Sequence, residues 1–281
     1  MSGDVGHHGG MVELNSDLVV ARHGRPLGSA PTLLLLHGLT DSADGWADAV
    51  GRWADDYALV TVDQRGHGGS PRFTAEQREN HPGELMVEDA VALVEQLDHP
   101  VVIGHSLGGA VALNLGVRRP DLVRGLVLED PAPLGPGEPA RNPARGREYL
   151  ANLRPSLEVA DDEELFRLRK ETHPSWPESE LLATGTAEQQ MDVDYLEHGE
   201  WKPLTTWPQL FAQLRVPTLV VSGDRADELC VDDAMEKGLA EIDNPVVTLV
   251  RVPGAGHCVR RDGPQRYHEV VDRWLGDLLG S

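Results

Sequence analysis

Cysteines, basic side chains and long apolar runs are scarce in this 281-residue chain. The two cysteines, Cys230 and Cys258, match neither a metal-binding nor a redox spacing, so we expect two free thiols. No apolar run is long enough to cross a membrane, and the polar start, 1–10, has no secretory signal pattern. We therefore expect a cytoplasmic protein with a flexible N-terminal tail at 1–10.

Basic side chains are too few to balance the acidic ones. Lysine and arginine total 25, against 46 aspartates and glutamates, which gives a net charge of -21. Phosphate backbones and anionic lipid surfaces bind basic patches, so neither nucleic acid nor a membrane is an expected partner. The pair His7-His8 in the tail is interpreted as two surface histidines. The sequence thus predicts no metal and no cofactor, and a small molecule as the partner.

What the chain does contain is a strand, a sharp turn and a helix around Ser106. The apolar run 101–103 stops at Gly104, and an apolar helical pattern begins directly after Ser106. Small residues at Gly104 and Gly108 avoid collisions in a turn that strains the serine backbone. The hydroxyl is then expected at the N-terminus of a helix, where backbone amides favour a developing anion.

Three further motifs each follow an apolar run. The first of these runs, within 32–36, does not alternate with polar residues, which indicates a strand buried on both faces, as in a parallel sheet. The motifs are His37-Gly38-Leu39 after 33–36, the Gly-rich loop 63–70 after 59–62, and Gly254-Ala255-Gly256-His257 after 246–252.

The loop 63–70 is the motif most easily confused with a phosphate-binding loop. It lacks the Lys-Ser/Thr pair of such a loop and leads into no immediate helix. We predict a structural turn in which Asp63 and Arg65 form a local ion pair. His37 is likewise expected to brace its own loop rather than to act as a base.

In order and in strand context, the four motifs resemble the alpha/beta-hydrolase superfamily over nearly the whole chain. The resemblance implies an α/β fold with a mostly parallel central sheet flanked by helices and an inserted helical cap. The proline-rich stretch 131–214 shows helical patterns but no strand run, which fits such a cap. We expect a core at 11–130 and 215–281, a cap at 131–214, and cap helices near 145–153, 161–171 and 177–184.

The resemblance places a nucleophile at Ser106 and a general base at His257. A serine hydroxyl needs a base to remove its proton, and histidine titrates near neutral pH. His105, next to the serine, is expected to point away from it in such a turn. The backbone amides of Leu39 and Leu107 are implied as the oxyanion hole, which stabilises developing negative charge.

The acid that orients the imidazole is left open by the sequence. The commonest family position, three residues beyond the glycine after the next-to-last strand, is occupied by Ala226, and Asp224 and Asp227 lie near it. Some relatives take the acid from the end of the preceding strand, where Asp130 follows Glu129. Asp130 and Asp224 are weighed equally as the triad acid, ahead of Asp227 and then Glu129.

Aromatic residues of the cap are candidates for lining a substrate pocket, because pockets are mostly apolar with few polar anchors. Trp176 and Trp207 are predicted to bind substrate, with packing of the cap onto the core as the alternative role. A cap of this kind favours a small, largely apolar substrate over a polymer.

The combined pattern predicts a cofactor-free serine hydrolase that cleaves an ester, a lactone or a related acyl bond. A serine rather than an aspartate at the turn argues against haloalkane dehalogenase and epoxide hydrolase chemistry. The alternative is hydrolysis of a carbon-carbon bond in a diketone or ring-cleavage product, which members of the family perform with the same triad. A ligand-binding sensor that has kept the fold without the activity is a third hypothesis.

Overall fold

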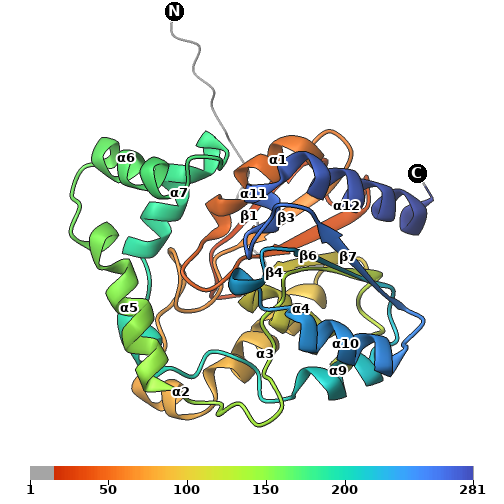
Figure 1. Cartoon of the computed structure of the whole chain (residues 1–281). Helices are drawn as coiled ribbons and strands as arrows, with labels where there is room; N and C mark the ends of the chain where they lie inside the picture. The colour runs from red at the N-terminus through yellow and green to blue at the C-terminus, as the bar shows by residue number, and fades with distance from the viewer. Residues whose placement is uncertain (1–15, 281) are drawn as a thin grey trace, which may run out of the picture.

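The computed structural model describes residues 16–280, which form a seven-stranded sheet with helices on both faces (Figure 1). The strand order is β1-β3-β2-β4-β5-β6-β7; β1 runs antiparallel to β3, and the other neighbouring pairs are parallel. The predicted α/β fold with a mostly parallel sheet is confirmed. The strands are β1 Val20–Gly24, β2 Thr32–Leu36, β3 Ala58–Val62, β4 Val101–His105, β5 Gly125–Glu129, β6 Thr218–Gly223 and β7 Val247–Val252.

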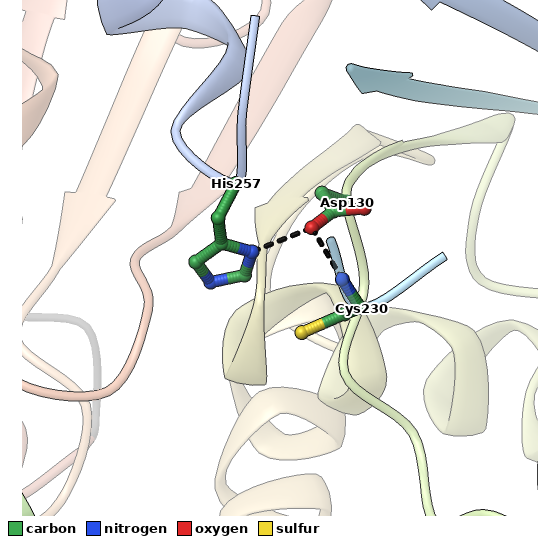
Figure 2. A group of neighbouring side chains, drawn as sticks. All are labelled: Asp130, Cys230 and His257. Carbon is green, nitrogen blue, oxygen red and sulfur yellow. Dashed lines mark hydrogen bonds and ion pairs between the residues drawn. The ribbon is translucent and has the colours of Figure 1, made fainter. Parts of the chain in front are cut away.

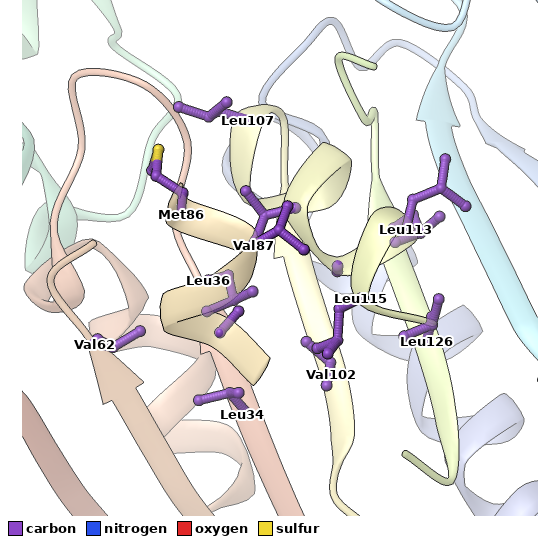
Figure 3. Close-up of a cluster of buried hydrophobic side chains, with 14 of the residues drawn as sticks. Leu34, Leu36, Val62, Met86, Val87, Val102, Leu107, Leu113, Leu115 and Leu126 are labelled. Carbon is purple, nitrogen blue, oxygen red and sulfur yellow. The ribbon is translucent and has the colours of Figure 1, made fainter. Parts of the chain in front are cut away.

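Strands β2 to β5 are buried along their whole length, as unbroken apolar runs predict for a parallel sheet covered on both faces. Consecutive side chains of a strand point to opposite faces, so Leu34 and Leu36 enter one core cluster while Leu33 and Leu35 enter the other. Figure 3 shows the first cluster between the sheet and the helices that cover it. The strand ends, and the loops that follow them, are thereby fixed in place.

Helices cover both faces of the sheet. On the face of Leu34 lie α3 (Pro82–Val94), α4 (Leu107–Arg118) and α10 (Asp233–Ile242). On the opposite face lie the 3-10 turn η1 (Ala43–Trp46), α1 (Ala47–Trp53) and α12 (Pro264–Leu279), with Trp46, Trp53 and Tyr267 as large buried side chains. The short elements are α2 (Ala75–Glu79), η2 (Ala226–Glu228) and α11 (Val259–Asp262).

The segment between β5 and β6 is mainly helical, as expected for a cap. Three of its helices were predicted, while α8 and α9 were not, because they are too short to show a helical period. In Figure 1, α5, α6 and α7 lie beside the sheet. The last helix, α9, instead packs on α4 and α10, with Leu210 and Phe211 in the first core cluster. The helices are α5 Pro143–Leu157, α6 Asp162–Thr172, α7 Glu178–Gln189, α8 Val193–His198 and α9 Trp207–Gln213.

The domain boundaries inferred from the sequence remain a proposal. The predicted tail, 1–10, and the first five residues of the predicted core lie outside the described residues. Within residues 16–280, no helix is both long enough and apolar enough to cross a membrane.

Candidate active site

Ser106 lies in the sharp turn between β4 and α4. Its backbone has φ 51° and ψ -112°, a conformation that is costly for a residue with a side chain. A Cβ added at Gly108 would collide with the backbone carbonyl of Leu36, and one added at Gly104 with that of Gly108. These two glycines let the strand and the helix approach closely enough to hold the serine in this turn.

His257 connects Ser106 to Asp130. Its Nε2 lies 3.0 Å from the Ser106 Oγ, and its Nδ1 lies 2.6 Å from the Asp130 Oδ2 (Figure 2 draws the second contact). The three residues follow β4, β5 and β7, whose carboxyl ends share one edge of the sheet. Serine, imidazole and carboxylate are thus joined in the order that nucleophilic catalysis by serine requires.

Asp130 is fully buried and is held by four donors. Its Oδ1 accepts hydrogen bonds from the Ser222 hydroxyl (2.7 Å) and the Val231 N–H (3.0 Å), and its Oδ2 accepts from the Cys230 N–H (2.8 Å) as well as from His257. Burial alone would raise the pKa of Asp130, but these hydrogen bonds and the His257 charge lower it below its usual range. The carboxylate is therefore ionised and cannot rotate.

The surroundings of His257 stabilise a positive charge on its imidazole ring. Burial alone would lower the pKa of His257, but Cys230 and the Asp130 carboxylate raise it well above its usual value. His105 packs beside His257 with ring centres 4.8 Å apart, and its Nε2 lies 3.2 Å from the His257 backbone oxygen. His105 thus braces the loop that carries His257.

The other candidate acids lie elsewhere. Asp224 is exposed, and its Oδ1 accepts a hydrogen bond from the Gly254 N–H at 2.7 Å. Asp227 is also exposed. Glu129 is buried, and its Oε1 accepts a hydrogen bond from the Arg260 N–H at 2.7 Å. Among the four carboxylates weighed from the sequence, the structure brings only Asp130 into contact with the imidazole of His257.

The loop after β2 lies directly beside the serine. Gly38 is so close to the side chains of His105 and Ser106 that a Cβ at this position would crowd both. The backbone N–H groups of Leu39 and Leu107 have no hydrogen-bond acceptor among residues 16–280. Two unpaired amides that flank a nucleophile are the donors that an oxyanion hole needs.

His37 braces this loop, as predicted. Its Nε2 accepts a hydrogen bond from the Gln64 N–H at 3.0 Å, and its Nδ1 donates to the Gly38 oxygen at 2.8 Å. Burial, as the largest influence, lowers the pKa of His37. The ring is therefore neutral and committed to two backbone partners.

The predicted ion pair between Asp63 and Arg65 is wrong. The Asp63 carboxylate accepts hydrogen bonds from the backbone N–H groups of Ala43 (2.8 Å) and Gly69 (2.9 Å). Arg65 instead binds Asp89 of α3 with two hydrogen bonds, at 2.8 and 2.9 Å. The loop is nevertheless a structural turn, because the carboxylate ties its two ends together.

The two predicted tryptophans have different surroundings. The Trp176 Nε1 donates to the Asp262 Oδ1 at 2.9 Å, and Asp262 also accepts from the Gly256 N–H, next to His257. Trp176 thus joins the segment between α6 and α7 to the His257 loop, and its contact with substrate stays a prediction. The Trp207 ring lies against Gly238 of α10. Trp207 therefore packs α9 on α10, which was the alternative role considered for it.

A buried ion cluster, which sequence reasoning missed, joins α7 to α11. Glu180 binds Arg260 and Arg261, and the second contact, from the Arg261 Nε, measures 2.6 Å. Arg261 also binds Asp41 at 2.6 Å, in the segment after the oxyanion loop. All four side chains are almost completely buried. The oppositely charged partners are 80 or more residues apart in the sequence, so no local pattern could reveal these pairs.

The model of the Alpha/beta hydrolase family matches residues 33–272, which is most of the chain. The chain belongs to the alpha/beta hydrolase family. The match spans all the loops that carry Ser106, Asp130 and His257.

Relatives within the alpha/beta hydrolase family act on different substrates. The chain is 28% identical to the sn-1-specific diacylglycerol lipase of Mus musculus, covering 87% of this chain and 81% of the lipase. It is 24% identical to the 2-(acetamidomethylene)succinate hydrolase of Mesorhizobium japonicum, covering 89% and 90%. A solved structure of an E-2-(acetamidomethylene)succinate hydrolase superposes with a TM-score of 0.75 at 20% identity, covering 97% of this chain and 99% of that one. The last likeness shows the shared fold alone.

Proposed function

We propose that the chain is a serine hydrolase that cleaves an ester, a lactone or a related acyl bond of a small, largely apolar substrate. The observation that carries the proposal is the 3.0 Å separation of the Ser106 Oγ and the His257 Nε2, with Asp130 against the other ring nitrogen. Membership of the family, and the lipase among the relatives, support a hydrolytic reaction. None of the steps proposed below requires a cofactor.

In the proposed reaction, His257 takes the proton of Ser106 as the Oγ attacks the carbonyl carbon. The amides of Leu39 and Leu107 hold the oxyanion, and the ionised Asp130 stabilises the imidazolium. His257 then returns the proton to the leaving alcohol, which departs and leaves an acyl-serine. Water, activated by the same imidazole, releases the acid and restores the hydroxyl.

The test is labelling with a fluorophosphonate, which reacts with activated serines, read by intact mass. We expect one adduct on the wild type and none on Ser106→Ala. Ser29→Ala, which removes an exposed serine hydroxyl, is the matched control and should label like the wild type. Labelling that survives in Ser106→Ala, or that is absent from folded wild type, would contradict the proposal.

A substrate panel then separates the reaction classes. Hydrolysis of p-nitrophenyl esters and lactones, abolished in Ser106→Ala, is the expected result. Cleavage of a chromogenic diketone without ester hydrolysis would instead assign carbon-carbon bond hydrolysis. Binding without turnover, unchanged by Ser106→Ala, would assign a ligand-binding protein.

A further inference from the structure

The Cys230 side chain lies beside the triad, although the proposed reaction gives its sulfur no role. Figure 2 shows the Cys230 sulfur below Asp130, pointing toward the side on which His257 lies. The Cys230 Sγ, a carboxylate oxygen of Asp130 and a ring nitrogen of His257 are all within 4.8 Å of one another. Three loops, after β5, before α10 and after β7, thus bring three metal-binding atoms together.

These three atoms form a donor set suited to zinc. Sulfur from cysteine, nitrogen from histidine and oxygen from a carboxylate are the ligands of Zn²⁺ in proteins, often three of them with a fourth position left for water. Asp130 is buried, whereas Cys230 and His257 are partly exposed, so an ion can enter from solvent. Cys230 forms no disulfide, which leaves its thiol available.

Contacts around the carboxylate already orient it as a metal ligand. The Ser222 hydroxyl and the Val231 N–H hold the Oδ1 of Asp130, and the Cys230 N–H holds the Oδ2. Hydrogen bonds of this kind fix ligand direction in metal sites. The same bonds that prepare Asp130 to orient the imidazole therefore prepare it to bind a cation.

We propose that Asp130, Cys230 and His257 form an inhibitory site for a thiophilic divalent cation such as Zn²⁺. The Cys230 thiol loses its proton to solvent and forms a sulfur–metal bond. The metal takes the Nδ1 lone pair of neutral His257, so the ring proton moves to Nε2. The Nδ1 and the Asp130 Oδ2, now 2.6 Å apart, separate to about 3.3 Å around a tetrahedral ion.

The position of the ring proton determines whether His257 can act as a base. An imidazole that carries its proton on Nε2 cannot accept the proton of Ser106, so the metal-bound enzyme lacks its base. The inhibition rests on the proposed hydrolase function, whereas cation binding does not.

The first test measures hydrolysis of p-nitrophenyl butyrate against free Zn²⁺, with each protein normalised to its own metal-free rate. Wild type and Cys258→Ser, which changes the other free cysteine, should lose activity in parallel and recover with EDTA. Cys230→Ser should need at least about tenfold more Zn²⁺ for the same inhibition. Changing a residue that only contacts a metal ligand already weakens metal binding about tenfold, and this variant loses a ligand itself. An active wild type that Zn²⁺ does not inhibit, or equal sensitivity of the two variants, would overturn the proposal.

The second test needs no activity. Cd²⁺ bound to a thiolate gives an ultraviolet charge-transfer band, which is expected in the wild type and Cys258→Ser and absent from Cys230→Ser. A wild type without the band, or a band that persists in Cys230→Ser, would refute the site. If the wild type shows the band but hydrolyses no substrate of the panel, the metal site is supported and the proposed function is contradicted.

Discussion

At the scale of single residues, Asp130 combines three features of a carboxylate held in one orientation. It has a positive φ of 33°, full burial and four hydrogen-bond donors. A positive φ is energetically costly for a residue other than glycine, so it persists only where the surroundings fix the backbone. The side chain therefore presents one oxygen to His257 in a single orientation.

Asp130→Asn should lower kcat by about 10³ to 10⁴-fold, because an amide can hold the wrong imidazole tautomer and cannot balance its charge. Asp227→Asn, at an exposed position in the neighbouring loop, should retain a kcat close to that of the wild type. Steady-state kinetics with an ester substrate, beside circular dichroism to verify folding, check both. Equal losses in the two variants would contradict the assignment of the acid.

Gly108→Ala should destabilise the fold by about 2 kcal/mol or more, because the new methyl group meets backbone on a buried side where nothing can move aside. Gly51→Ala is the matched change in an open, exposed position of α1, where nothing lies within 4 Å. It should stabilise the fold by roughly 0.5–1 kcal/mol through helix propensity. Urea unfolding of both variants measures the difference, and a Gly108→Ala protein as stable as Gly51→Ala would refute the close approach.

The sequence could supply Ser106 and His257 but not the choice between Asp130 and Asp224. Both aspartates follow neighbouring parallel strands, so both loops reach the same sheet edge, and spacing along the chain does not encode which carboxylate turns inward. Trp207 was placed at the substrate for a similar reason. Its apolar ring suits a pocket and a helix interface equally well.

At the scale of elements, α7 and α11 are joined by a buried ion cluster. Glu180 is the shared acceptor of Arg260 and Arg261, and Arg261 continues to Asp41. Burying such charges is costly, so the cluster is stable only while each charge has its partner. The cluster therefore couples the position of α7 to the loop that carries His257.

Glu180→Gln should lower the free energy of unfolding by about 3 kcal/mol, because it leaves two buried guanidinium groups short of negative charge. Glu178→Gln, on the same helix, removes only an exposed contact with Lys170 and should cost about 0.5 kcal/mol or less. Urea unfolding gives both values, and limited proteolysis should show faster cleavage near α7 in Glu180→Gln alone. Equal unfolding free energies for Glu180→Gln and Glu178→Gln would argue against the cluster as a stabilising contact between α7 and α11.

At the scale of the whole molecule, the fold could be predicted because the apolar runs and the four loop motifs are local in sequence. What could not be predicted depends on contacts between distant segments, such as Glu180 with Arg261 or Trp176 with Asp262. The short helices α8 and α9 were missed because one or two turns give too few residues for a period.

The acid stability of the whole chain should depend in part on Asp41. Burial alone would raise the pKa of Asp41, but Arg261 and other contacts lower it from 3.8 to about 2. Because the folded pKa lies below the unfolded one, this stabilisation is complete above the unfolded value and is lost as pH falls through the folded value. The pair therefore matters most at neutral pH.

The difference in unfolding free energy between the wild type and Asp41→Asn should narrow by about 1 kcal/mol from about pH 6 to about pH 3. Asp44→Asn is the control. Burial raises the pKa of Asp44, so protonation of that carboxyl favours the folded state. The difference in unfolding free energy between the wild type and Asp44→Asn should therefore change in the opposite direction as pH falls. Urea unfolding at the two pH values tests both. A constant difference for Asp41→Asn would show that Arg261 does not hold that carboxylate ionised.

The three residues Arg260, Arg261 and Asp262 follow His257 closely, and each contacts the helical segment between β5 and β6: the arginines through Glu180 and the aspartate through Trp176. That segment therefore should not be exchangeable for its counterpart from another family member without further changes. A chimera would need a glutamate at the position of 180 and an indole at that of 176, or a matching replacement of the loop 260–262. Recombination that respects this pairing should give folded hybrids, and recombination that ignores it should leave two buried arginines without the carboxylate that they share.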